Sequence, residues 1–168
     1  PILDNLRVPK KHGRHRYQSL PESIDRFRER YPQGFYDDRF VEEERDYKIQ
    51  AHQLAQNLLG KSELARLLSA NDCTEVCRRA LSVSGETNLI FPNEKMVLRD
   101  GLKVLAHQQA FATALFHLLY GDGDLQPRFE TYADILRDIG AAKRNIDTYF
   151  LFIVSTQEYI HHKTLLQQ

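Results

Sequence analysis

The apolar residues that follow Arg39 recur at the spacing of an α-helix, and this pattern constrains the fold more than any other feature of the sequence. Their steps of seven, four, three and four residues keep them on one face of a helix with about 3.6 residues per turn. They are Phe40, Tyr47, Ala51, Leu54 and Leu58. Because Gly60 follows as a stop signal, the sequence predicts an amphipathic helix from about Arg39 to Leu59.

One acidic residue, Glu44, falls on this apolar stripe. A buried carboxylate costs free energy unless a partner compensates its charge. Two interpretations follow. Either the first turn of the helix is exposed and Glu44 stays in water, or Glu44 is buried and paired with an arginine from another segment.

The same spacing and its capping signals recur along most of the chain. Ser19 with Glu22, and Asp72 with Glu75, have the spacing of capping boxes at two helix starts. Residues 102–120 are apolar on nearly every face, which is typical of a helix at the centre of a bundle. Further helices are predicted at about residues 19–30, 62–69, 72–83, 94–120 with a break near Gly101, 127–139 and 142–165.

These elements predict an all-α fold, a multi-helix bundle of roughly six to eight helices with an extended basic N-terminal arm. We assign residues 1–18 to the arm, because Pro9 and Gly13 interrupt any helical pattern there. Residues 19–168 are then a single helical domain. No pair of alternating runs joined by a tight turn predicts a hairpin.

The composition bounds the class of protein. Hydrophobic residues make up 42% and charged residues 27% of the chain, which is ordinary for a globular domain. The most apolar run, Tyr149–Val154, is far shorter than the ~20 residues that span a bilayer. The first residues lack a charged leader followed by an apolar region, and Cys73 and Cys77 do not make a disulfide framework. We therefore expect no membrane association and a cytoplasmic location.

The net charge is zero but is unevenly distributed. Residues 1–30 hold eight lysines and arginines against four acidic residues, and the densest part lies in the arm. Such charges can neutralise phosphates, and a second cationic series recurs every four residues further on. The candidate nucleic-acid-binding residues are Lys10, Lys11, Arg14, Arg16, Lys95, Arg99 and Lys103. The last three share one ridge only if their helix continues through Gly101, and solvated charges are the alternative in both places.

No motif for catalysis or for a cofactor is present. The phosphate-binding and dinucleotide-binding glycine motifs are absent, as is the nucleophile elbow. Cys73 and Cys77 share a helix face, but a zinc site would need two more ligands. Glu158 and His161 have the Glu-x-x-His spacing of di-iron bundles, which requires a second such pair that the chain lacks. We therefore predict no catalytic residue, no cofactor and no metal ligand.

Three functional hypotheses remain. The first is a non-enzymatic helical interaction domain, part of a larger bacterial-type nucleic-acid-handling system, whose basic arm contacts nucleic acid or an acidic protein partner. The second is a metal-dependent or catalytic helical protein with a site assembled from Glu44, Glu158, His161 and other scattered histidines. The third is a structural module that forms homo-oligomers through Tyr149–Val154, since six consecutive apolar residues exceed what one buried helix face requires.

Overall fold

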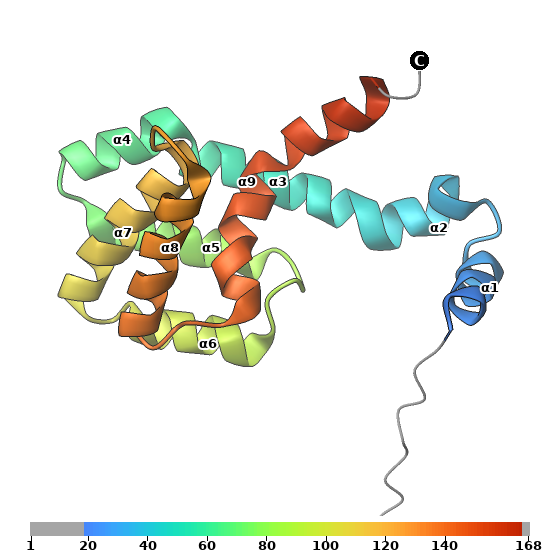
Figure 1. The fold of residues 1–168 in the computed structure, drawn as a ribbon, viewed down its shortest axis with the longest axis horizontal. Coiled ribbons are helices and arrows are strands. Elements are labelled where there is room, and N and C mark those ends of the chain that lie inside the picture. The colour runs from blue at the N-terminus through green and yellow to red at the C-terminus, as the bar shows by residue number, and fades with distance from the viewer. Residues whose placement is uncertain (1–18, 166–168) are drawn as a thin grey trace, which may run out of the picture. The chain divides into compact units, whose positions relative to one another are not determined.

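The computed structural model describes the backbone of residues 19–165 and the side chains of residues 19–155 (Figure 1). This part of the chain consists of helices and connecting loops, without a strand. The predicted all-α, multi-helix architecture is therefore confirmed. The chain divides into two compact units, Pro1–Val41 and Glu42–Gln168, which are described separately below. The predicted basic arm lies outside the described residues.

The first unit begins with helix α1 (Leu20–Arg30), whose start follows the predicted capping box. The Ser19 backbone N–H donates to the Glu22 carboxylate at 2.9 Å, and the Ser19 hydroxyl oxygen accepts from the Glu22 N–H at 3.4 Å. Two short elements follow, the 3-10 helix η1 (Gly34–Tyr36) and the single-turn helix α2 (Asp38–Phe40).

An aromatic cluster holds these short elements together. The rings of Phe27, Tyr31, Phe35 and Phe40 pack with centroid separations of 5.0 to 5.7 Å. Each such pair contributes on the order of 1 kcal/mol beyond burial of its area. Tyr31 is buried, whereas Phe35 is 67% exposed. The unit therefore has a small aromatic core with one open side.

The predicted continuous α-helix from Arg39 is wrong in its first third. Residues Val41–Asp46 form a π-helix, η2, and the regular helix α3 (Tyr47–Leu59) begins only after it. A π-helix takes up one more residue per hydrogen-bonded turn than an α-helix. A single period of about 3.6 residues therefore does not describe residues 39–59.

Glu44 lies within η2 and is partly exposed. Its side chain is 41% accessible, and its carboxylate accepts from Lys48 Nζ at 3.4 Å, one turn further along the chain. The hypothesis of a buried pair with an arginine from another segment is wrong. An exposed pair of this kind contributes a few tenths of a kcal/mol.

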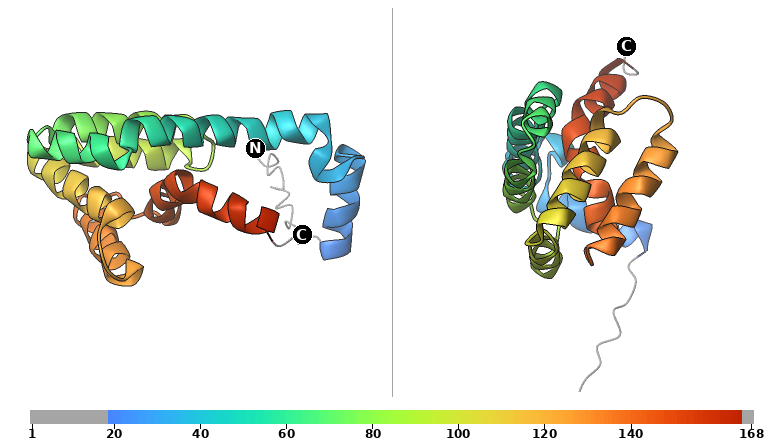
Figure 2. Two further views of the ribbon diagram at one scale, coloured as in Figure 1. Left: turned by 90° about the horizontal axis from the view of Figure 1, so that it is seen from above. Right: turned by 90° about the vertical axis from the view of Figure 1, so that its left-hand side faces the viewer.

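The helical body, as we call residues 42–165, contains seven longer helices, of which α7 contacts four, namely α4, α5, α8 and α9. α7 lies between α4 and α5 on one side and α8 on the other, and α9 contacts α3, α7 and α8 (Figures 1 and 2). α7 thus has a central place in the contacts of the body, but the prediction of an interior helix over residues 102–120 holds only in part, because Leu105, Gln109, Thr113 and His117 leave one face exposed. The helices are α3 (Tyr47–Leu59), α4 (Lys61–Ser69), α5 (Cys73–Gly85), α6 (Pro92–Gly101), α7 (Leu105–Tyr120), α8 (Leu125–Asp138) and α9 (Arg144–Leu165).

Two glycines mark close approaches of the backbone. A Cβ added at Gly60, between α3 and α4, would lie 2.6 Å from the Gln56 carbonyl oxygen. A Cβ added at Gly101, the last residue of α6, would lie 2.6 Å from the Ile139 carbonyl oxygen just after α8. Real Cβ atoms do not approach backbone oxygens so closely, so the end of α6 and the end of α8 meet because residue 101 has no side chain.

Two side chains of α3 form hydrogen bonds with backbone carbonyl oxygens of α9. His52 Nδ1 lies 2.6 Å from the Ile153 carbonyl oxygen, and Gln56 donates to the Val154 carbonyl oxygen at 2.7 Å. The apolar run Tyr149–Val154 is explained largely by this position, since all but Leu151 and Phe152 are buried in the core. Among the described helices, none is long and apolar enough to cross a membrane.

Candidate functional site

The candidate nucleic-acid-binding residues fall into two groups in the structure. Lys10, Lys11, Arg14 and Arg16 lie outside the described residues. The other group lies on and just after α6, but not on one helical ridge, because α6 ends at Gly101 and Lys103 stands in the following turn. The condition for a continuous ridge is therefore not met, while the prediction of nucleic-acid binding stays a prediction.

The three cations on and just after α6 have different environments. Lys95 is half-buried and donates to the Thr87 carbonyl oxygen at 2.7 Å, so it holds the loop before α6. Lys103 is exposed and pairs with Asp100 at 2.7 Å. Arg99 is exposed and forms no ion pair or hydrogen bond with the described residues. Arg99 is thus the member of this group that is freely available to an anion.

Sequence reasoning missed two further cations close to α6. The connection from α8 to α9 runs beside α6 (Figure 1), because Gly101 meets Ile139 and Asn145 Nδ2 donates to Glu94 Oε2 at 2.9 Å. Lys143 and Arg144 lie on this connection and at the first position of α9, and both are exposed. The available signal was the adjacent pair of cations between the helices predicted at residues 127–139 and 142–165.

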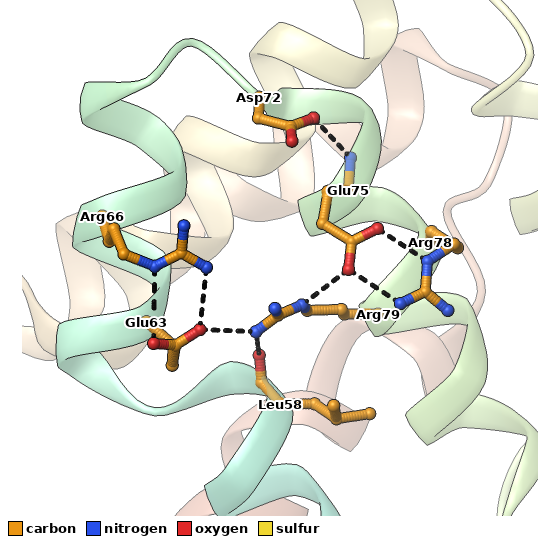
Figure 3. Close-up of polar contacts among 7 residues, drawn as sticks. All are labelled: Leu58, Glu63, Arg66, Asp72, Glu75, Arg78 and Arg79. Carbon is orange, nitrogen blue, oxygen red and sulfur yellow. Dashed lines mark hydrogen bonds and ion pairs between the residues drawn. The ribbon is translucent and has the colours of Figure 1, made fainter.

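A different group of charged side chains, centred on Arg79, forms ion pairs between helices of the body. Arg79 on α5 lies 2.9 Å from Glu75, 3.0 Å from Glu63 on α4 and 3.2 Å from the Leu58 carbonyl oxygen at the end of α3 (Figure 3). Its side chain is only 14% exposed. Arg66 and Arg78 occupy the outer sides of the same two carboxylates. We call these residues the Arg79 network; it ties three helices together.

The network also explains a departure from the predicted capping box at α5. The Asp72 side chain accepts from the Glu75 N–H at 3.1 Å, as predicted. The Glu75 carboxylate, however, faces Arg78 and Arg79 instead of completing the box. Hydrogen bonds from Arg78 and then Arg79 lower the pKa of Glu75 to about 2. The pKa of Glu63 is lowered as well, first by its hydrogen bonds with Arg66 and Arg79.

Two histidines and both cysteines have structural environments, whereas His117 is exposed. His107 Nδ1 lies 2.8 Å from the Gly101 carbonyl oxygen, and His52 contacts α9 as described above. Burial raises the pKa of the Cys77 thiol to about 12 and also raises that of Cys73, so neither thiol ionises readily. Within residues 19–155, no three histidine, cysteine or acidic side chains gather so as to hold a metal ion. The side chains of Glu158 and His161 lie outside the described residues.

Two polar side chains without partners in the described part of the chain, Tyr132 and Asp147, lie on α8 and α9. The Tyr132 hydroxyl is fully buried and the Asp147 Oδ1 atom is inaccessible, and neither has a hydrogen-bond partner among the described residues. Desolvation raises the pKa of both groups. Asp147 adds to the rise in the pKa of Tyr132, whereas at Asp147 itself the charge of Arg137 opposes the rise and that of Glu94 adds to it. Glu94, which is nearly buried, accepts from Asn145 and from the Phe91 N–H. These contacts fix the start of α9 against α6.

An open cleft of about 420 Å³ lies between α7, α8 and α9. Leu125 and Phe152 contribute to its apolar walls. Arg128 lines it too, but its guanidinium donates to the carbonyl oxygens of His117, Leu118 and Gly123 and so caps the end of α7. The one charged side chain of the cleft is therefore used by the fold.

The chain matches no known family model, no curated protein and no solved structure.

Proposed function

We propose that the protein is a non-enzymatic helical interaction domain that binds nucleic acid through exposed cations of its basic arm and of α6. The observation that carries the proposal is the environment of Arg99, an exposed guanidinium without a carboxylate partner among the described residues. A guanidinium in water is well suited to a phosphate oxygen, because its planar array of N–H donors matches that group.

The sequence of the arm supports the same function. Lys10, Lys11, Arg14 and Arg16 stand within seven residues without an intervening acid. Together with Arg99 and Lys103 they offer several single-charge contacts, which release counterions from a nucleic acid without reading its sequence. We therefore expect binding that depends strongly on salt and weakly on base sequence.

The test is a titration of a fluorescently labelled duplex and of a single strand with the full chain, followed by anisotropy at two salt concentrations. About four phosphate contacts to a duplex predict a loss of about a hundredfold in affinity between ~50 and ~200 mM salt. A variant with Lys10, Lys11, Arg14 and Arg16 changed to glutamine should bind more weakly and with a shallower salt dependence.

Absence of binding by the full chain at ~50 mM salt would refute the proposal. Binding that is insensitive to salt would also contradict it, because the counterion effect is the physical basis of the expected affinity. A direct titration of a labelled acidic polypeptide with the full chain tests the other class of partner. If that polypeptide binds and neither nucleic acid does, the cations serve an acidic protein instead.

A further inference from the structure

Most lysines and arginines of residues 42–155 are engaged within the fold. They pair with carboxylates or donate to backbone carbonyl oxygens, as in Arg45, Lys48, Arg66, Arg78, Arg79, Lys95, Lys103, Arg128 and Arg137. The exceptions in this range are Lys61, Arg99, Lys143 and Arg144, all of which are exposed. Unengaged cations are thus a minority, and their location is informative.

All of these exceptions but Lys61 lie in one region of the helical body. Arg99 is on α6, and Lys143 and Arg144 are on the connection that runs beside α6. Two contacts hold this connection in place at both ends, namely the hydrogen bond between Asn145 and Glu94 and the close approach of Gly101 to Ile139. The chain therefore brings cations about forty residues apart in sequence onto adjoining segments.

Exposed carboxylates reduce this positive charge only in part. Asp100 pairs with Lys103, and Asp138 is exposed near the end of α8. The Glu94 carboxylate points inward to its hydrogen bonds with Asn145 and Phe91. Four cations thus stand near two exposed acids, Asp100 and Asp138, and the half-buried Asp147 in the first turn of α9, which leaves a surplus of positive charge.

We propose that Arg99, Lys103, Lys143 and Arg144 form one phosphate-binding surface, which we call the α6 surface, and that the α8–α9 connection is its second half. This inference rests on the proposed function and extends it to residues that the sequence pattern did not indicate. The ligand is the phosphate backbone of a nucleic acid. Separate, exposed charges on two adjoining segments suit a row of phosphates better than a single bound anion, which a more enclosed group of donors would hold.

The chain offers a matched control for the test. Lys143 and Lys61 are both exposed lysines without a partner in the described chain, and each stands at or just before the start of a helix, α9 and α4 respectively. α4 lies at the opposite edge of the helical body from α6 (Figure 1). Lys143→Gln and Lys61→Gln therefore make the same change of net charge at two separate places.

The experiment measures the dissociation constant of the full chain for a labelled duplex across a series of salt concentrations. The unchanged chain, Lys61→Gln, Lys143→Gln and the double variant Lys143→Gln/Arg144→Gln are compared. Each lost phosphate contact lowers the slope of log K against log salt by about one. We expect a reduction of about one for Lys143→Gln and about two for the double variant, with Lys61→Gln unchanged.

Circular dichroism and thermal melting of each variant establish that the fold is retained. If the unchanged chain does not bind, both the proposed function and the α6 surface are wrong. If it binds, and the slopes of Lys143→Gln and Lys61→Gln are equal, the α6 surface is wrong while the proposed function stands. A slope reduced only in the Lys143 variants supports the α6 surface.

Discussion

Replacing Arg79 by alanine should destabilise the helical body far more than the same change at its neighbour Arg78. Both guanidinium groups bond the Glu75 carboxylate, at 2.9 Å and 2.6 Å respectively. Their environments differ, because the Arg79 side chain is 14% exposed and that of Arg78 is 64% exposed. Water and salt screen the Arg78 pair, although Arg78 is the larger cause of the low pKa of Glu75.

The magnitude for Arg79 follows from what its removal leaves behind. The Leu58 carbonyl oxygen loses its side-chain donor, and two carboxylates lose the cation between them. Hydrogen bonds to charged groups contribute about 1.5–3 kcal/mol each when buried, but the carboxylates of Glu63 and Glu75 regain water. Together with the lost packing of the aliphatic stem, the expected destabilisation is about 2 kcal/mol.

Thermal melting followed by circular dichroism at 222 nm measures the difference. For a chain of this length about 2 kcal/mol corresponds to a decrease in Tm of roughly 4–8 °C. Arg78→Ala should change Tm by a degree or two at most. Arg79→Lys keeps the charge but loses the fork of donors, so its Tm should fall between those of the unchanged chain and Arg79→Ala. Equal Tm values for the alanine variants at 78 and 79 would refute the claim that burial decides the contribution.

Three further predictions concern pH, an unpaired hydroxyl and a backbone contact. The pKa of Glu75 is about 2 in the folded state and near 4.5 in the unfolded state. Its contribution to stability is therefore present above pH ~4.5 and is lost as the pH falls towards 2. Glu75→Gln should flatten the fall of Tm between pH ~5 and ~2. Tyr132→Phe removes a fully buried hydroxyl without a partner among the described residues, so it should leave the free energy of unfolding unchanged or raise it by about 1 kcal/mol in urea titrations, and a clear loss would contradict this reasoning. Gly101→Ala places a Cβ 2.6 Å from the Ile139 carbonyl oxygen, so it should lower stability by roughly 1–3 kcal/mol, whereas a neutral result would show that α6 and α8 separate easily.

The sequence was sufficient for those parts of the fold that depend on local signals. The capping box of Ser19 and Glu22, the break at Gly101 and the central position of α7 all follow from spacing within one helix or turn. The Asp72 cap was predicted for the same reason, but the orientation of Glu75 was not. Arg78 and Arg79 lie one turn further on and compete for that carboxylate, and only the packed position of α4 shows which interaction prevails.

Two other features were beyond the reach of a periodic pattern. A π-helix changes the period itself, so Val41–Asp46 cannot be recognised by matching residues to a period of about 3.6. The candidate surface was only half predicted, since Arg99 and Lys103 belong to a regular series while Lys143 and Arg144 do not. Their proximity to α6 depends on a tertiary hydrogen bond and a backbone contact, neither of which leaves a periodic signal in the sequence.

The distribution of charge within the helical body bears on why Arg99, Lys143 and Arg144 have no ion-pair partner among the described residues. Elsewhere the fold places a carboxylate three or four residues from most of its cations, as with Glu63 and Arg66 or Glu75 and Arg79. Such pairs form readily on a helix surface and stabilise it slightly. Leaving Arg99, Lys143 and Arg144 without an ion pair among the described residues costs little in turn, because water and salt screen exposed charges. A small loss of stability thus leaves these cations free for a phosphate, whereas a carboxylate at each would have to be displaced first.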